Sequence, residues 1–483
     1  MSSFTLTRQH ENQVSRRDAL KRAACGFGHT AMLGLLGNEA LASASSEKSA
    51  GLTARQGHFQ ATAKRVIFLF IHGGVSHIDS FDPKPELTKH HGKPSPITKP
   101  EFEFATTGNL LKSPWSFRPY GECGMPVSEL FPEISSIVDD IALIRTMQGN
   151  QVAHGGASLM LHTGEGVTIR PSLGAWTLYG LGSENDNLPG FVTLSPSTYH
   201  GGAQNYGSAF LPATYQGTAI GDGNSAPRSK TIRNLTPANP NTALQRLQLD
   251  LLKKANSEHT KNREHDERLQ SRIESFELAF RMQMTAPDVL DITQETGSTK
   301  AQYGIGSPTT DDFGYQCLLA RRLSESGVRF VQVNHSYPRN YWDAHGNLMG
   351  NHGTAAPKID KPIAGLIKDL KQRGLLDETL VVWGTEFGRT PASQGSDGRD
   401  HHPHAFSMWM AGGGIKGGTI YGKTDDFGYY PIEDPCPMKD FHATILHTLG
   451  LDHERLTYRY SGRDYRLTDV EGKVVREVLS SAS

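Results

Sequence analysis

Histidines and acidic residues recur in short groups along this chain, and their types suit metal binding or acid–base chemistry. The 483 residues include 21 His but only 4 Cys. Neutral imidazoles and carboxylates are common ligands of divalent cations. The first group, HGGVSHIDSFDPKP, holds His72, His77, Asp79 and Asp82. Its glycines would let the backbone approach a ligand closely, although a turn with solvated polar groups explains the same pattern.

Two further groups follow apolar runs later in the chain. The segment YWDAHGN carries Asp343 and His345, which stand two apart in an expected loop and can both face one ion. The run TLVVW leads into GTEFGRTP, which puts Glu386 at the end of a strand and Arg389 three residues on. A buried carboxylate needs a cation or hydrogen-bond donors, and Arg389 or a metal ion would meet that need. A loop with scattered histidines and a structural Glu–Arg pair remain the alternatives.

Two more segments complete the set of reactive groups. The sequence DHHPH contains His401, His402 and His404, of which we expect at most two to share a ligand, because adjacent side chains point in different directions. The segment HGGASLMLHTG, residues 154–164, predicts a short helix with His154 at its start. A helix N-terminus stabilises an anion or an activated nucleophile. Ser158 in this segment is alternatively a helix-surface residue.

The elements that must position these groups alternate between strands and helices. Four short apolar runs are typical of strands buried on both faces, at 66–71, 141–144, 328–333 and 379–383. An apolar stripe from Lys358 to Arg373 predicts a helix that ends at Gly374. This alternation predicts an α/β fold with a doubly wound, mostly parallel sheet flanked by helices. In such a sheet, ligands gather at the carboxyl ends of the strands, where the reactive groups stand.

Two other segments differ in composition from this pattern. Residues 243–283 are long, charged and helix-permissive, which predicts a helical insertion. Residues 185–240 are rich in Gly, Asn, Pro and Ser, which predicts a long loop region over a site. We expect a single α/β domain over 63–475, preceded by a flexible linker at 45–62 and followed by a tail at 476–483.

The first 44 residues have the parts of an export signal. Arg16 and Arg17 precede a mildly apolar run and the small-residue segment ALASA. Paired arginines predict the twin-arginine route and a periplasmic or secreted protein, while an amphipathic helix is the alternative. No unbroken apolar run reaches the eighteen residues or so that a spanning helix requires, so we expect no transmembrane span after cleavage.

Charge and cysteine content exclude several classes of protein. Lys and Arg number 49 against 50 Asp and Glu, which gives a formal net charge of −1. A chain without a basic surplus is not expected to bind nucleic acid. After the expected signal only Cys123, Cys317 and Cys436 remain, far apart in sequence. This spacing predicts no disulfide framework and no structural zinc site, although one bridge is possible. The sequence makes no prediction of oligomeric state.

Six segments follow one another along the chain in this order: SRR, FLFIHGGVSHIDSFDPKP, HGGASLMLHTG, YWDAHGN, VVWGTEFGRTP and GRDHHPHAFSMWMAGGGIKGG. In this order they resemble the alkaline phosphatase superfamily of metal-dependent phospho- and sulfohydrolases. More closely, the chain resembles the exported bacterial family called domain of unknown function 1501, often labelled sulfatase-like. The resemblance implies an alkaline-phosphatase-like fold, a divalent metal (Zn, Ca, Mg or Mn) and a small-molecule or glycan ester as substrate.

Compared position by position, the chain departs from the characterised hydrolases. An Asp ends their first strand as a metal ligand, whereas His72 holds that place here, with Asp79 and Asp82 nearby. His154 occupies the place of the nucleophile, which argues against sulfatase chemistry based on a modified Cys or Ser. The resemblance and the residue types together imply catalytic roles for His154 and Arg389 and these metal ligands: His72, Asp79, Asp343, His345, Glu386, His402 and His404.

Three functional hypotheses follow. The first is an exported metal-dependent hydrolase that acts on phosphate or sulfate esters, in which the metal polarises the ester and Arg389 steadies the oxyanion. The second is a non-catalytic relative that binds glycans or other ligands at the cell envelope. The third is a metal-handling or redox role, which rests only on the histidine count and the export signal.

Overall fold

A nine-stranded sheet forms the centre of the computed structural model, which describes residues 52–100, 104–224, 267–339 and 341–480 and parts of 244–255. These described residues belong to one compact unit, Gly51–Ser483. The strands lie in this order across the sheet: β12 (Thr419–Tyr421), β4 (Ile141–Gln148), β11 (Phe406–Ala411), β8 (Thr379–Gly384), β1 (Arg65–Ile71), β7 (Phe330–His335), β5 (Phe191–Leu194) and β6 (Thr218–Ile220), with β15 (Cys436–Pro437) beside β4.

The strand directions decide which loops meet. β1 pairs in parallel with β7 and β8, and β5 continues the parallel arrangement to β6. Among the described strands of this sheet, only β11 runs antiparallel to its neighbours, β4 and β8. β11 therefore brings its first residues to the edge where the parallel strands end. This arrangement confirms the predicted doubly wound, mostly parallel sheet.

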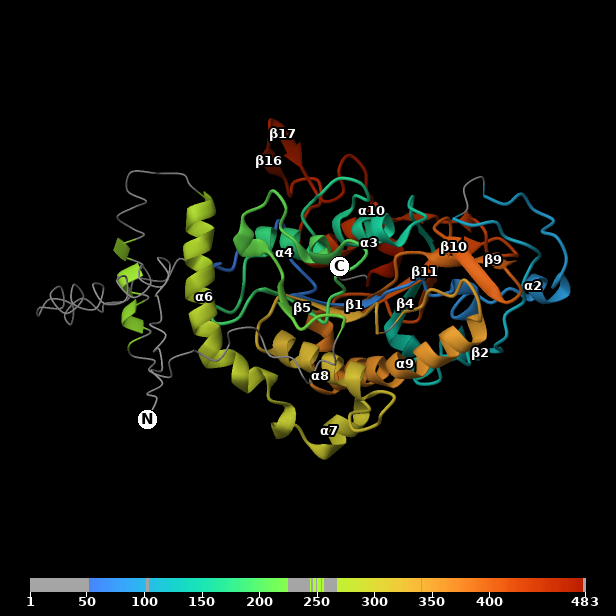
Figure 1. The fold of residues 1–483 in the computed structure, drawn as a ribbon, viewed down its shortest axis with the longest axis horizontal. Helices are drawn as coiled ribbons and strands as arrows, with labels where there is room; N and C mark the ends of the chain where they lie inside the picture. The colour runs from blue at the N-terminus through green and yellow to red at the C-terminus, as the bar shows by residue number, and fades with distance from the viewer. Residues whose placement is uncertain are drawn as a thin grey trace, which may run out of the picture. The chain divides into compact units, whose positions relative to one another are not determined.

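Helices cover both faces of the sheet (Figure 1). Alternate residues of a strand face opposite sides, and β1 shows this clearly. Ile67, Leu69 and Ile71 belong to the core under the helices α8 (Asp311–Glu325) and α9 (Leu348–Gln372). Val66, Phe68 and Phe70 belong to the core under α3 (His154–Thr163), α4 (Leu173–Leu181) and α10 (Met438–Thr448). Two buried cores thus fix the sheet from both sides.

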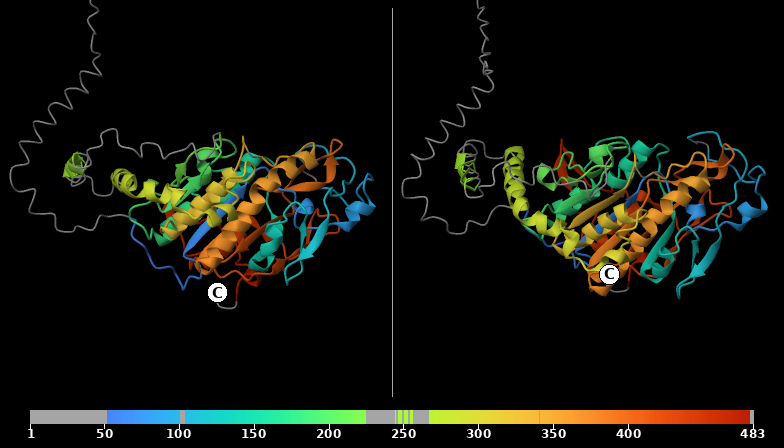
Figure 2. Two further views of the ribbon diagram at one scale, coloured as in Figure 1. Left: turned by 90° about the horizontal axis from the view of Figure 1, so that it is seen from below. Right: turned by 60° about the horizontal axis from the view of Figure 1, so that its bottom comes forward.

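Smaller elements surround this three-layered centre (Figure 2). The structure also describes the α-helices α2 (Pro85–Lys89), α6 (Glu267–Leu290) and α7 (Gly297–Gln302). Four antiparallel hairpins have these strands: β2 (Phe117–Tyr120) with β3 (Met125–Ser128), β9 (Gly388–Gln394) with β10 (Gly398–His402), β13 (Lys423–Thr424) with β14 (Pro431–Glu433), and β16 (Tyr458–Tyr460) with β17 (Arg463–Tyr465).

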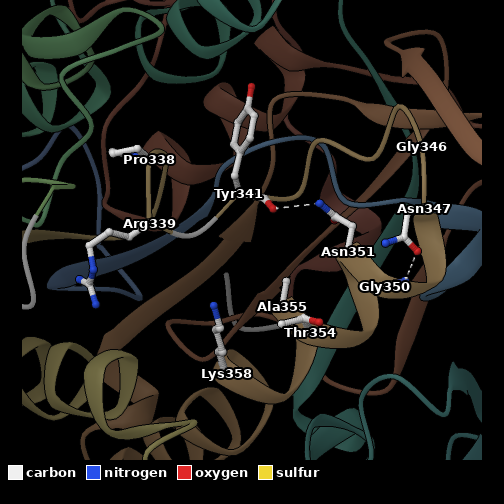
Figure 3. Close-up of a pocket in the computed structure, with 10 residues that line it drawn as sticks. All are labelled: Pro338, Arg339, Tyr341, Gly346, Asn347, Gly350, Asn351, Thr354, Ala355 and Lys358. Atoms are coloured by element: carbon white, nitrogen blue, oxygen red, sulfur yellow. Dashed lines mark hydrogen bonds between the residues drawn. The ribbon is translucent and has the colours of Figure 1, made fainter.

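The helix α9 begins earlier than the predicted stripe at Lys358. The Asn347 side chain caps it by accepting a hydrogen bond from the backbone N–H of Gly350 at 3.1 Å, which satisfies a donor that a helix start leaves open. Asn347 itself has φ +49°, a left-handed conformation that Asn tolerates. The first turns of α9 line a pocket together with Pro338 and Tyr341 (Figure 3).

Parts of the predicted organisation lie outside the described residues. These include the signal at 1–44, most of the linker, and much of the helical insertion at 243–283. Of that insertion, the structure describes helical residues between 244 and 255 and the helix α6, which continues to Leu290. None of the described helices combines the length and apolar character needed to cross a bilayer.

Candidate metal centre

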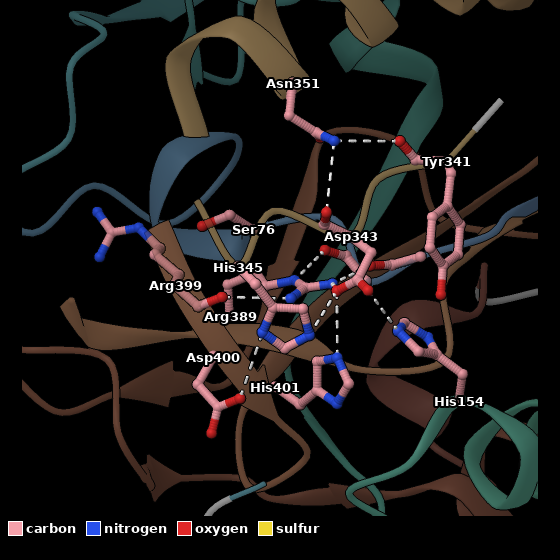
Figure 4. Close-up of polar contacts among 12 residues, drawn as sticks. Ser76, His154, Tyr341, Asp343, His345, Asn351, Arg389, Arg399, Asp400 and His401 are labelled. Atoms are coloured by element: carbon pink, nitrogen blue, oxygen red, sulfur yellow. Dashed lines mark hydrogen bonds and ion pairs between the residues drawn. The ribbon is translucent and has the colours of Figure 1, made fainter. Parts of the chain in front are cut away.

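The reactive groups meet at the edge of the sheet where β1, β4, β7 and β8 end (Figure 4). His72 follows β1, His154 begins α3 after β4, Asp343 lies in the loop after β7, and Glu386 follows β8. The hairpin β9–β10 precedes the antiparallel β11 and carries His401 to the same edge. Segments that are far apart in sequence therefore supply one site, as expected for a parallel α/β sheet.

The glycine after His72 lets the backbone hold Glu386. Gly73 has φ +122°, and its backbone N–H donates to Glu386 Oε1 at 2.9 Å and to Oε2 at 3.1 Å. A Cβ atom at position 73 would lie 2.4 Å from the backbone nitrogen of Trp342, so only glycine fits. Burial opposes the ionisation of Glu386, but His72 and His154 outweigh it and lower its pKa to about 2. Glu386 is therefore a buried carboxylate at neutral pH.

His154 bridges the two carboxylates of the site. Its Nδ1 lies 2.7 Å from Glu386 Oε1, in hydrogen-bond contact, and its Nε2 lies 3.3 Å from Asp343 Oδ2. This Nε2 atom is buried and makes no hydrogen bond with the described residues. Burial alone would lower the pKa of His154, but Asp343 and Glu386 raise it above its ordinary value.

Asp343 collects four nitrogen-bearing side chains. Arg389 Nη2 donates to its Oδ1 at 2.7 Å, and His345 Nε2 and His401 Nε2 lie 3.0 Å and 3.2 Å from the same oxygen. With His154, these neighbours hold the pKa of Asp343 well below its usual range in spite of its burial. One carboxylate is thus shared by three imidazoles and a guanidinium.

The surroundings of Arg389 differ from the role that the sequence predicted. The side chain is fully buried. Its Nε donates to the carbonyl of Gly74 at 2.9 Å, its Nη1 to that of Arg399 at 3.2 Å, and its Nη2 to the carbonyl of Gly73 as well as to Asp343. All three nitrogens serve protein acceptors, so the geometry favours a role in positioning Asp343 over the predicted contact with an oxyanion.

A further acid lies at the outer side of the site. Asp400 Oδ2 accepts a hydrogen bond from the backbone N–H of Ala105 at 2.7 Å. Its Oδ1 is buried without a hydrogen bond to any described residue and lies 3.7 Å from His345 Nδ1. The half-exposed ring of Phe104 packs against that of His401, tilted by 32°, with 4.5 Å between ring centroids. Asp400 and His401 were noticed in the sequence but were not chosen as ligands.

His200 is a neighbour of the site that the sequence analysis did not name. Its Nδ1 lies 2.9 Å from His72 Nε2, and its ring stacks on that of His154 at 5.0 Å. It lies in the Gly-rich segment that was predicted to cover a site, and its φ of +51° is unusual for a residue other than Gly. The predicted loop over a site was the only sequence feature that pointed to His200.

The described residues offer three overlapping groups of possible metal ligands. In each group, one donor atom per residue lies within 4.8 Å of the others. Burial chiefly lowers the pKa of His72 and of His401, each to about 4, so both imidazoles are neutral at pH 7 and retain a lone pair. With ionised Glu386 and Asp343, this donor set suits a divalent cation. The groups are His72 with His154 and Glu386, His154 with Asp343 and His401, and His345 with Asp400 and His401.

Three residues predicted as ligands have other partners. Asp79 accepts hydrogen bonds from Arg399 Nε at 2.7 Å and Nη2 at 3.2 Å, and both side chains are fully buried. His402 Nε2 lies in hydrogen-bond contact with the carbonyl of Tyr429 at 2.8 Å. His404 packs edge-on against His402 with 5.5 Å between ring centroids. These three residues take no part in the three ligand groups.

The fold and this donor set define an α/β protein with a candidate metal centre at the carboxyl edge of a mostly parallel sheet. The chain belongs to the family described as Protein of unknown function (DUF1501), whose model matches residues 63–479. Among curated protein sequences, none matches the chain.

Several solved structures align with most of the chain at low similarity. The lipoteichoic acid synthase LtaP from Listeria monocytogenes is 9% identical, with 86% of this chain and 78% of that chain covered and a TM-score of 0.35. The alkaline phosphatase from the Antarctic bacterium TAB5 is 12% identical, with 80% of this chain and 98% of that chain covered and a TM-score of 0.33. The PsFucS1 sulfatase from Pseudoalteromonas sp. is 12% identical, with 81% of this chain and 68% of that chain covered and a TM-score of 0.34. Similarity at this level assigns no function to the chain.

Proposed function

We propose that this protein is a metal-dependent hydrolase of phosphate or sulfate esters. The observation that carries the proposal is the set of three overlapping ligand groups at the carboxyl edge of the sheet, in which His154 belongs to two groups and His401 to two. Two buried atoms that make no hydrogen bond with the described residues support it: His154 Nε2, which lies 3.3 Å from Asp343 Oδ2, and Asp400 Oδ1, which lies 3.7 Å from His345 Nδ1. A divalent cation held there would polarise the ester and make a water molecule more acidic.

Within this proposal, His154 accepts or donates a proton during hydrolysis, and the cation would be held by other residues of the three groups. Its hydrogen bond with ionised Glu386 keeps a proton on Nδ1, which leaves Nε2 as the atom that changes protonation. Alternatively, unprotonated Nε2 attacks phosphorus, the P–O bond to the alcohol breaks as the alcohol leaves with a proton from water, and a second water then cleaves the P–N bond to release phosphate. Glu386 and Arg389 position the reactive side chains through the contacts described above.

The non-catalytic alternative also has an observation behind it. Phe387 packs its ring 4.8 Å from that of His154 and 4.3 Å from that of His401. It stands where the resembled hydrolases have a ligand histidine, so one ligand of theirs is missing here. A protein that binds an anionic ligand through a metal ion without turning it over would have the same donor set.

Metal content and turnover separate the two functions. Metal in the purified protein is measured by mass spectrometry, and hydrolysis of 4-nitrophenyl phosphate and 4-nitrophenyl sulfate is followed with and without chelator. The proposal expects a bound divalent cation and hydrolysis that the chelator abolishes. Bound metal without hydrolysis of a broad panel of esters supports the binding protein. A protein that takes up no divalent cation refutes both metal-based functions.

The His154→Gln variant then tests the role of the imidazole. We expect it to lower kcat by roughly 100-fold or more, the usual contribution of a general acid or base. Unchanged kcat in this variant would assign proton transfer to another group. The Ser158→Ala variant is a control on the same helix, because the Ser158 hydroxyl is buried and lies in none of the three ligand groups.

We also propose that the protein is exported through the twin-arginine route. Support comes from the sequence alone: Arg16 and Arg17 precede a weak apolar run and a small-residue segment. The test is fractionation of cells that express the full chain and the variant with Arg16→Lys and Arg17→Lys. Export of both proteins in equal amounts would overturn this proposal.

A further inference from the structure

A polar pocket of about 430 Å³ includes Tyr341 in its lining, and Figure 3 shows the residues that line it. Its wall is formed by the loop after β7 and the first turns of α9. The residues that matter most for its chemistry are Arg339, Tyr341, Asn351, Thr354 and Lys358.

Tyr341 lines this pocket and also lies against the candidate metal centre. The ring of Tyr341 lies 5.2 Å from the ring of His72 and 5.2 Å from that of His154. The backbone carbonyl of Tyr341 faces the pocket side, where it accepts a hydrogen bond from Asn351 Nδ2 at 3.3 Å. The same amide lies 3.5 Å from the carbonyl of Asp343. A ligand in the pocket therefore stands next to the groups that hold the proposed cation.

The described lining of the pocket is basic. Arg339 and Lys358 line it, and none of the ten described residues that line it is acidic. Arg339 Nη2 forms an ion pair with Asp312 Oδ2 at 2.7 Å, which fixes the guanidinium in place, and a guanidinium has five N–H donors in all. The two cations act together on buried His335 at the end of β7, whose pKa is lowered chiefly by burial and further by Lys358 and Arg339. Asn351 and Thr354 add neutral polar atoms.

We infer that this pocket binds a second anionic group of the substrate, so that the preferred substrates are esters with two anionic groups, one at the metal centre and one between Arg339 and Lys358. The inference rests on the proposed function for the first of these groups. Guanidinium and ammonium groups bind phosphate, sulfate and carboxylate through charge-assisted hydrogen bonds. The pocket lies beside the reacting groups, so it would select substrates without taking part in bond cleavage.

Equilibrium binding tests the pocket separately from turnover. The probes are two non-hydrolysable analogues of a hexose phosphate, one with a single phosphonate and one with two, titrated by calorimetry into the metal-loaded protein. We expect the bisphosphonate to bind roughly tenfold more tightly than the monophosphonate, which corresponds to about 1.4 kcal/mol. The variant with Arg339→Gln and Lys358→Gln should bind both probes equally.

A variant that loses the same amount of charge outside the pocket is the control. Lys361 and Lys368 lie in α9 outside the pocket lining, so Lys361→Gln with Lys368→Gln should keep the tenfold preference. Equal binding of both probes by the unaltered protein, or a preference that survives in the Arg339/Lys358 variant, overturns the inference. If the preference depends on these two residues but no ester is hydrolysed, the pocket stands and the proposed hydrolase function fails.

Discussion

Nδ1 of His154 lies 2.7 Å from Oε1 of Glu386, although 232 positions separate the two residues in the sequence. Glu386 also accepts two hydrogen bonds from the backbone N–H of Gly73, so its carboxylate joins the loop after β1 to the start of α3. This contact fixes which nitrogen of His154 faces Asp343. A carboxylate that orients an imidazole in this way sets the proton position on the ring.

Replacing Glu386 should remove the metal. In Glu386→Gln the amide oxygen still accepts from Gly73, but the negative charge that faces His72 and His154 is lost. We expect the affinity for a divalent cation to fall by roughly 100-fold or more, since changes to outer-shell partners alone cost 10–100-fold. Titration with a metal-sensitive dye measures this. Glu378→Gln on the surface is the control, and equal affinity in both variants would remove Glu386 from the centre.

The neighbouring residues His401 and His402 should differ sharply. His401 Nε2 faces Asp343 at 3.2 Å, whereas His402 Nε2 is engaged by the carbonyl of Tyr429. His401→Gln should therefore lower the bound metal and weaken its binding at least tenfold, and His402→Gln should leave both unchanged. His402→Gln should cost only about 1 kcal/mol of stability, the usual net value of one hydrogen bond. Metal loss in His402→Gln with retention in His401→Gln would contradict the structure.

Asp79 should matter for stability and not for metal binding. It forms a fully buried ion pair with Arg399, and the removal of one partner leaves a buried charge without compensation. Asp79→Asn should lower the free energy of unfolding by about 3–5 kcal/mol. Urea unfolding measures the change, and metal analysis should find the full metal content. The matched control is Asp464→Asn in the exposed Arg459–Asp464 pair, which should cost under about 1 kcal/mol.

The protein should lose stability in mild acid. Burial lowers the pKa of His162 and His352 to about 3 and that of His442 to about 4, and the three residues lie outside the ligand groups. Since an unfolded His has a pKa near 6.5, the unfolded chain binds more protons between pH 6.5 and about 4. The free energy of unfolding should therefore fall as pH falls through this window, by about 1.4 kcal/mol per pH unit for each histidine.

Urea unfolding of the chelated protein at pH 5.0 to 7.5 measures this slope. His162→Leu should reduce the slope by about one proton, because the imidazole that takes up a proton in the unfolded chain is then absent. Leucine also suits the place, since His162 packs edge-on against Phe68 and Phe70. A slope that is the same in His162→Leu and in the unaltered protein would contradict the lowered pKa of His162.

The central strands were predictable because they are short apolar runs between helical segments. The runs at 66–71, 141–144, 328–333 and 379–383 correspond to β1, β4, β7 and β8, and their ends hold His72, Asp343 and Glu386 as expected for a parallel sheet. The antiparallel β11 was not foreseen, since strand direction depends on pairing and leaves no local pattern in the sequence.

The partners of the site residues were harder to predict. In the run DHHPH, alternate side chains of β10 point to opposite sides, and sequence alone does not tell which side faces Asp343. The structure turns His401 to Asp343 and His402 to Tyr429. From the sequence, Asp79 was as plausible a metal ligand as the other acids, because its counter-charge, Arg399, lies 320 positions away. His200 was missed because its loop has no periodic pattern to place it.

The wide sequence separation within the centre also has a consequence for folding. The chain cannot form the His154–Glu386 contact until β1, β4 and β8 have paired across the sheet, and contacts of such long range form slowly because each closes a large loop. A cation that needs this whole donor set would bind only after the sheet is complete, so it would slow unfolding of the finished protein without speeding its formation.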